Sequence, residues 1–198
     1  EKVRECYSVP SLKIHLHKQI PTESGLGGGS SDAVQVLQLL KAHFKLNISK
    51  ERMWKMALEL GSDCPFFIEG QAARVQGKGE VISPISLSLK GKYILMIKPE
   101  FSISTSDAFS KIIPHNSQVL NEEYLKDINQ WQAHFVNDFE KVIGLQHPEI
   151  INIKEILLKN GAVYASLSGS GSAVYGIFNQ LPTLRFPSDY FYWAGQLQ

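Results

Sequence analysis

The sequence predicts an α+β fold, and three observations lead to that prediction. Strand-like and helix-like periodicities both occur along the 198 residues. They do not alternate regularly, as the strands and helices of a doubly wound parallel sheet would. The composition, with 43% hydrophobic and 20% charged residues, is that of a globular protein that can bury a core.

The composition also argues against several classes of function. The formal net charge of +1 gives no electrostatic reason to expect a nucleic acid or an anionic membrane as partner. No apolar run approaches the roughly 20 residues that span a bilayer. Two cysteines, Cys6 and Cys64, are too few for a disulfide framework and lack the spacing of a zinc site. We therefore expect a cytoplasmic protein with reduced thiols.

The first part of the chain is expected to hold a strand and two helices. Apolar and polar residues alternate over residues 11–18, which predicts a half-buried strand. From Ser30 the apolar period becomes 3.6, which predicts a helix with one buried face. Ser49 is expected to cap a second helix that runs to about Leu60. The predicted face of the first helix consists of Ala33, Val36, Leu37, Leu40 and Phe44.

The remaining elements are predicted from short apolar runs and turn residues. Phe66-Phe67-Ile68 is expected to form a short strand, and residues 72–85, with Gly70 before them and Gly77 and Gly79 within them, are expected to form a hairpin. The polar link 86–92 is the predicted boundary between two domains, 1–88 and 89–198. Beyond this link, helices are predicted over residues 106–112, 128–143 and 148–159. Further strands are predicted over residues 93–97, 163–167, 174–178 and 190–193.

The strongest motif is a glycine-rich segment that leads into the first long helix, Gly25-Leu26-Gly27-Gly28-Gly29-Ser30-Ser31-Asp32. Consecutive glycines let backbone N–H groups converge on one point, because no Cβ blocks the approach of a ligand. The helix directs its free N–H groups and the positive end of its dipole at that point. Such a nest suits a polyphosphate, although the segment matches neither a P-loop nor a Rossmann turn. A flexible linker with a serine cap is the alternative.

Two further motifs carry weaker signals. Asp63 follows Gly61-Ser62 and precedes an apolar run, where a carboxylate can accept a proton from a substrate hydroxyl. Alternatively, Asp63 ends or caps a helix. The second glycine cluster, Ser168-Gly169-Ser170-Gly171-Ser172, forms a turn that can lie close against a ligand or another loop, or is simply a tight turn.

In their order and chemistry, the three motifs resemble the GHMP kinase superfamily, which includes galactokinase, homoserine kinase and mevalonate kinase. The triple glycine before Ser-Ser-Asp-Ala is similar to the branch that acts on a cytidyl methylerythritol, whereas homoserine and mevalonate kinases generally read Gly-Leu-Gly-Ser-Ser. Other matching segments are Lys18 before Ile20-Pro21, Gly77-Lys78-Gly79-Glu80-Val81, Lys98-Pro99, Ser104-Thr105 and Asn137-Asp138-Phe139-Glu140.

The resemblance implies a GHMP kinase fold, with a ribosomal-S5-like ATP-binding domain followed by a ferredoxin-like domain. The implied reaction transfers the γ-phosphoryl group of ATP to the 2-hydroxyl of the cytidyl methylerythritol, in the non-mevalonate isoprenoid route. Asp63 is the implied base, Mg²⁺ neutralises phosphate charge, and Thr105 and Phe109 are weaker substrate-binding candidates. For Phe109 the alternative is a core position. The implied ATP-binding residues are Pro21, Thr22, Glu23, Ser24, Gly25, Leu26, Gly27, Gly28, Gly29, Ser30 and Ser31.

The sequence departs from the family pattern in two ways. Thr22-Glu23-Ser24 and Val34 replace smaller residues of the family around the glycines. The family's first motif, whose lysine assists the catalytic aspartate, is not found, so we expect an upstream segment to supply that lysine. The resemblance then implies that these 198 residues alone do not turn over substrate. Two alternatives stay open: a homoserine-type or mevalonate-type kinase, and a nucleotide-binding member without catalysis.

Overall fold

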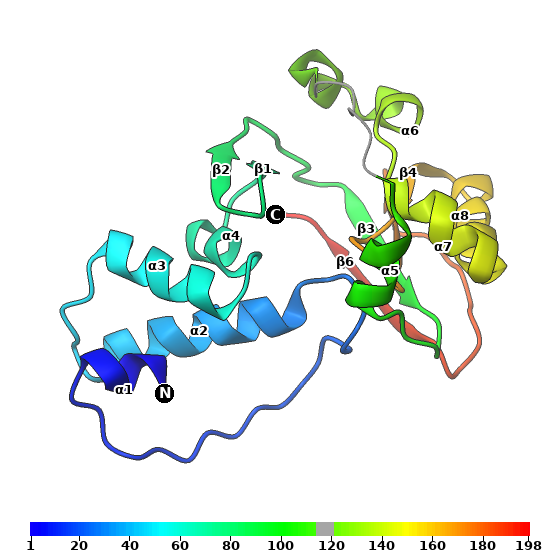
Figure 1. The fold of residues 1–198 in the computed structure, drawn as a ribbon. Coiled ribbons are helices and arrows are strands. Elements are labelled where there is room, and N and C mark those ends of the chain that lie inside the picture. Colours follow the sequence, from blue (N-terminus) through cyan, green and yellow to red (C-terminus); the bar gives the residue numbers. More distant parts are fainter. Residues whose placement is uncertain (114–120) are drawn as a thin grey trace. The chain divides into compact units, whose positions relative to one another are not determined.

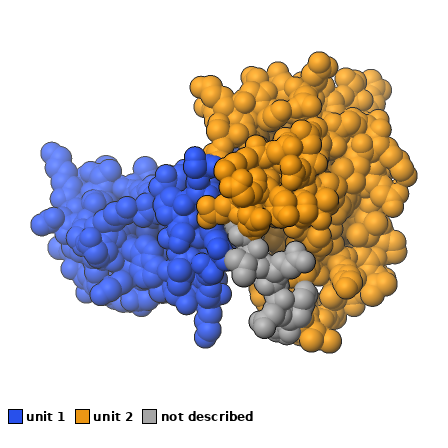
Figure 2. Space-filling view, turned by 90° about the horizontal axis from the view of Figure 1, so that it is seen from above, with its two compact units in different colours: residues 1–19, 27–86 blue, residues 20–26, 87–198 orange. Residues whose placement is uncertain are grey.

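The computed structural model describes residues 1–113 and 121–198, which divide into two compact units (Figures 1 and 2). Unit 1 comprises residues 1–19 and 27–86, and unit 2 comprises residues 20–26 and 87–198. The segment 20–26 therefore belongs to unit 2, although the chain on both sides of it belongs to unit 1. The assignment of residues 1–88 and 89–198 as functional domains stays a prediction.

Unit 1 is a small helical layer with one hairpin. Its four helices surround an apolar core, and α3 begins after Ser49, whose Oγ accepts a hydrogen bond from the Arg52 N–H as predicted. The elements are α1 (Lys2–Cys6), α2 (Gly28–His43), α3 (Lys50–Leu60), α4 (Cys64–Glu69), and the antiparallel strands β1 (Ala73–Gln76) and β2 (Val81–Pro84). The buried core residues are Val3, Val9, Val34, Leu37, Ile48, Met53, Met56, Ala57 and Cys64.

Three expectations for unit 1 are wrong. Residues 11–18 form no strand, because a strand needs a hydrogen-bonded neighbour and no described residue pairs with them. Residues 66–68 lie in α4 and not in a strand. Pro65 fits the first turn of a helix and Gly70 ends it in the left-handed region (φ 63°), whereas a three-residue apolar run cannot distinguish the two structures. The predicted face of α2 also omitted Val34, which is fully buried in the core.

Unit 2 is built on an antiparallel four-stranded sheet with the order β4-β5-β3-β6. Alternate residues of β4 enter two different cores, as a period of two requires: Ala165 and Leu167 pack with α7 and α8, and Tyr164 packs with Trp131. The strands are β3 (Tyr93–Lys98), β4 (Ala162–Leu167), β5 (Val174–Phe178) and β6 (Phe191–Gln196). The helices are α5 (Thr105–Lys111), α6 (Trp131–His134), α7 (Asp138–Gln146), α8 (Pro148–Lys159) and 3₁₀ turns at Glu122–Lys126 and Ile128–Gln130.

Most elements predicted for unit 2 are confirmed, but the single helix over residues 128–143 is wrong. The chain forms a 3₁₀ turn and α6, leaves the helical conformation at Phe135, and starts α7 after Asn137. The Asn137 Oδ1 accepts a hydrogen bond from the Phe139 N–H at 2.9 Å, which caps α7. The apolar period runs through this break, so periodicity alone cannot reveal it.

Candidate active site

In unit 2, the residues before the first glycine lie against the second glycine cluster. The Ser172 and Ala173 N–H groups donate to the carbonyl oxygens of Glu23 and Ser24 at 3.2 and 2.9 Å. The Ser168 hydroxyl donates to the carbonyl oxygen of Gly25 at 2.9 Å. Three consecutive carbonyl groups are therefore fixed by one turn, residues 168–173, which we call the clamp turn. Of the two sequence interpretations of this turn, a close approach to another loop is correct.

The close approach explains why glycine stands at position 25. Gly25 has a φ of 74°, in the left-handed region, and a Cβ on it would lie 1.8 Å from the Ser168 carbonyl oxygen. No side chain fits at that distance. The clamp turn also requires glycine, because Gly169 and Gly171 have positive φ angles of 52° and 92°. The two glycine clusters, far apart in the sequence, are thus two sides of one contact.

A buried lysine holds the chain beside the clamp turn. Lys98, at the end of β3, is 6% exposed, and its Nζ donates to the carbonyl oxygens of Pro99 and Phe101 at 3.1 and 3.0 Å. The Phe101 carbonyl also accepts a hydrogen bond from the Ser172 hydroxyl at 2.8 Å. Burial lowers the pKa of Lys98, and the negative charge of Glu23 opposes that shift. No role was predicted for Lys98, because its acceptors are backbone carbonyl groups, which no sequence pattern marks.

In unit 1, the glycines that follow begin α2. Gly27 has a φ of 66° and lies against the Phe67 ring, since a Cβ on Gly27 would be 2.7 Å from the Phe67 Cζ. No side chain of the described residues caps α2. The N–H groups of Gly28, Gly29 and Ser30 lie in the first turn and have no acceptor within the helix. These donors lie at the positive end of the α2 dipole, and such an arrangement binds anions.

Asp63 also belongs to unit 1, where it directly precedes α4. Its side chain is exposed and makes no cap hydrogen bond to that helix, and the Ser62 hydroxyl lies 3.4 Å from the Asp63 Oδ1. The Ser62 carbonyl packs against Gly79, where a Cβ would lie 2.3 Å from the Ser62 oxygen. The hairpin thereby fixes the backbone that carries Asp63. Its carboxylate is available to a ligand, while its predicted role as base stays a prediction.

The two weaker candidates both lie in unit 2, on α5. The Thr105 hydroxyl is 3.4 Å from the Ser170 hydroxyl, so Thr105 borders the clamp turn. Phe109 is 62% exposed and contacts the Phe139 ring edge to face, with ring centroids 4.9 Å apart. The alternative of a core position for Phe109 is therefore wrong, and its predicted role in substrate binding stays a prediction.

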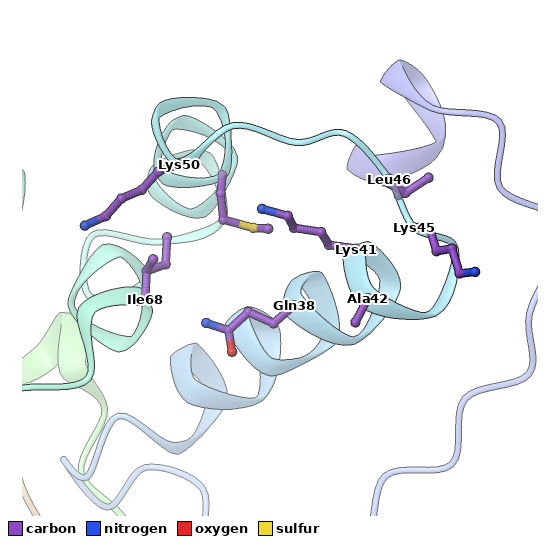
Figure 3. Close-up of a pocket in the computed structure, with 8 residues that line it drawn as sticks. Gln38, Lys41, Ala42, Lys45, Leu46, Lys50 and Ile68 are labelled. Carbon is purple, nitrogen blue, oxygen red and sulfur yellow. The ribbon is translucent and has the colours of Figure 1, made fainter.

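A cavity of about 490 Å³ lies at the opposite end of α2 (Figure 3). It has an apolar floor that includes Met53 and Ile68, and Lys41, Lys45 and Lys50 stand around it. In Figure 3 the Lys41 side chain points toward the side of the cavity on which Lys50 lies, whereas the Lys45 side chain points away. Cations at the end of α2 complement the negative end of its dipole, and Lys50 pairs with Glu69 at 2.9 Å. These interactions account for the lysines, and none of the predicted site residues lines the cavity.

Two properties of the described residues bear on metals and membranes. No group of three or more histidine, cysteine, aspartate or glutamate side chains could hold a metal ion within the part of the chain that the structure describes. No helix in that part is long and apolar enough to span a bilayer.

Comparisons with known proteins identify the family. The family models described as "GHMP kinases N terminal domain" and "GHMP kinases C terminal" match residues 1–71 and 120–184. A protein named 4-diphosphocytidyl-2-C-methyl-D-erythritol kinase, from Bacteroides thetaiotaomicron, is 46% identical over 190 residues, which cover 94% of this chain and 69% of that protein.

Two solved structures have similar folds. A crystal structure of 4-(cytidine 5'-diphospho)-2C-methyl-D-erythritol kinase matches with a TM-score of 0.69 and 29% identity, over 81% of this chain and 59% of that chain. Homoserine kinase from Cytophaga hutchinsonii matches with a TM-score of 0.65 over 91% of this chain and 68% of that chain, and at 15% identity it shows the fold alone. The predicted family and the predicted α+β GHMP kinase fold are confirmed. This chain belongs to the 4-diphosphocytidyl-2-C-methyl-D-erythritol kinase family of the GHMP kinases.

Proposed function

We propose that the protein is an ATP-dependent small-molecule kinase that phosphorylates 4-diphosphocytidyl-2-C-methyl-D-erythritol at its 2-hydroxyl, in the non-mevalonate route to isoprenoid precursors. The observation that carries the proposal is the glycine-rich segment. The carbonyl groups of Gly25 and of the two residues before the segment, Glu23 and Ser24, are held by the clamp turn, and the first N–H groups of α2 have no acceptor within the helix. The name of the 46% identical relative supports the choice of substrate.

The ATP-binding residues in this proposal are the eleven from Pro21 to Ser31, which cross the boundary between the two units. The N–H groups at the start of α2 bind the phosphate oxygens, and the dipole of α2 stabilises the negative charge. Asp63 orients the 2-hydroxyl and takes its proton as the oxygen attacks the γ-phosphorus. The bond from the γ-phosphorus to the bridging oxygen breaks, and ADP leaves. Phosphoryl transfer depends mainly on positioning and electrostatics, which these groups supply together with the lysine expected from an upstream segment.

Mg²⁺ enters the proposal with the nucleotide. Magnesium commonly keeps several waters and binds through few protein ligands plus the substrate phosphates. The absence of a ready carboxylate or imidazole cluster among the described residues fits that mode. The Ser30 and Ser31 hydroxyl groups, at the start of α2, are the residues that would hold the ion. When bound, Mg²⁺ neutralises part of the phosphate charge.

A panel of acceptors tests the proposed function. ADP release is measured with the protein expressed from its whole coding sequence, with ATP and Mg²⁺, and with the cytidyl methylerythritol, homoserine or mevalonate as acceptor. We expect turnover with the first acceptor alone. Turnover with homoserine or mevalonate instead would reassign the substrate. No turnover with any acceptor, together with normal ATP binding, would favour a nucleotide-binding member without catalysis.

A further inference from the structure

The clamp turn is itself held by two side chains from the start of α7, Asn137 and Glu140. The Asn137 Nδ2 donates to the carbonyl oxygens of Leu167 and Gly169 at 2.9 and 2.7 Å, on the two sides of Ser168. Ser168 is the residue whose hydroxyl binds the Gly25 carbonyl. One amide group therefore fixes the chain on both sides of the contact with the glycine-rich segment.

Glu140 fixes the strand end that leads into the clamp turn. Its Oε1 accepts hydrogen bonds from the Leu167 N–H at 2.8 Å and from the Ser166 hydroxyl at 3.0 Å. Its Oε2 pairs with the Lys154 Nζ of α8 at 2.5 Å. The residue is 8% exposed, so its charge is nearly removed from water and relies on these three donors.

A buried ion pair in the core of unit 2 is the structural alternative for Glu140. That alternative explains the Lys154 contact, but it leaves unexplained why the other contacts of Glu140 and both amide contacts of Asn137 fall on residues 166–169. A buried ion pair alone is commonly no more stabilising than packed apolar side chains. Because these polar contacts all fall on the chain next to Ser168, we infer that they hold Ser168 in position.

We propose that Asn137 and Glu140 are positioning residues for the phosphates of the nucleotide. They fix the clamp turn, which fixes the carbonyl groups of Glu23, Ser24 and Gly25. The inference rests on the proposed function, in which these residues lead into the phosphate-binding N–H groups. It assigns a role to two residues of the Asn137-Asp138-Phe139-Glu140 segment, which resembles a segment of the GHMP kinases and had no predicted role.

The test distinguishes two roles of Asn137, which holds the clamp turn and caps α7. Asn137→Asp keeps an oxygen that can cap α7, because aspartate is as good a cap as asparagine, but it loses both amide donors to the clamp turn. Asn160→Asp is the matched control. It also removes an amide donor, from Asn160 Nδ2 to the Ile156 carbonyl at 2.8 Å, at the C-terminal end of α8, which precedes β4 and is separated by that strand from the clamp turn.

Two measurements are made on each variant of the protein expressed from its whole coding sequence. One is the dissociation constant of Mg-ATP. The other is the hydrogen-exchange rate of the Ser172 and Ala173 amides, which donate to the carbonyl groups of Glu23 and Ser24 and can be followed without nucleotide. For Asn137→Asp we expect an about tenfold weaker Mg-ATP affinity and an about tenfold faster exchange of both amides. Asn160→Asp should change neither quantity.

Glu140 provides the second variant pair. Glu140→Gln keeps an acceptor for the Leu167 N–H and should retain most of the Mg-ATP affinity, whereas Glu140→Ala should lose about tenfold. Equal Mg-ATP affinities and amide exchange rates in Asn137→Asp and Asn160→Asp would overturn the inference and leave the proposed function intact. Equal affinities in Glu140→Gln and Glu140→Ala would also count against it. A parent protein that binds no Mg-ATP would overturn the proposed function, and the inference with it.

Discussion

Replacing Gly25 by alanine is expected to detach the glycine-rich segment from the clamp turn. The new Cβ would lie 1.8 Å from the Ser168 carbonyl oxygen, whereas ordinary contact begins at 3.4 Å. The segment must therefore move by about 1.6 Å, the difference of the two distances. That movement breaks the hydrogen bonds to Gly25 and Ser24, each worth about 0.5–1.5 kcal/mol. Alanine at a φ of 74° adds about 1–2 kcal/mol of strain.

Together these terms amount to about 3 kcal/mol, which corresponds to an affinity for Mg-ATP about 100-fold weaker. Gly161→Ala isolates the effect of the close contact. Gly161 lies in the same unit with a φ of 92°, but a Cβ on it meets nothing within 4 Å. It therefore shares the strain and lacks the clash. Both variants are compared by Mg-ATP titration and by thermal unfolding. If Gly25→Ala and Gly161→Ala bound Mg-ATP equally well, the close approach would have no part in nucleotide binding.

Three further substitutions test separate parts of the site. Asp63→Asn removes the proposed base, so kcat should fall about 10²–10⁴-fold. Because the Asp63 side chain makes no cap hydrogen bond to α4, the Mg-ATP affinity and the melting temperature should stay unchanged. A kcat within a few-fold of the parent would make Asp63 a structural residue. Glu23→Gly removes a negative charge and places glycine at a φ of 49°, which glycine adopts without strain. Mg-ATP should therefore bind several-fold more tightly, most clearly at low salt. Weaker binding of Mg-ATP would contradict this expectation. Lys98→Met tests the lowered pKa of a buried amine. Below the ordinary pKa of 10.5, the folded state of the parent binds fewer protons than its unfolded state, so its unfolding free energy should rise with pH relative to that of Lys98→Met. Urea titrations between about pH 8 and pH 10 measure this difference. A difference that stays constant with pH would contradict the lowered pKa.

Local patterns predicted those elements whose structure depends on nearby residues. Ser49 caps α3 by a hydrogen bond to Arg52, three residues away, and the hairpin of β1 and β2 closes around glycines with positive φ. The predicted strand over residues 11–18 failed for the opposite reason. Its alternation of apolar and polar residues is real, but strand formation depends on a pairing partner that the pattern of one segment does not specify.

The same distinction applies to the candidate site. The glycines around position 25 indicated a phosphate loop because the demand for positive φ is local. Their contact with the clamp turn joins residues 143 positions apart, as in the bond from Ser168 to Gly25, and no local signal encodes it. Lys98 was missed for a related reason. Its acceptors are backbone carbonyl groups, which every residue carries and which no sequence pattern marks.

Nuclear magnetic resonance of the glycine amides can test whether residues 21–31 bind the phosphates of ATP. The 198 residues contain 15 glycines, so selective ¹⁵N labelling gives a small set of signals. Addition of Mg²⁺ with a non-hydrolysable ATP analogue should shift the signals of Gly25, Gly27, Gly28 and Gly29 and leave that of Gly144, in the interior of α7, in place. Shifts confined to glycines outside residues 21–31, with these four unmoved, would contradict the account.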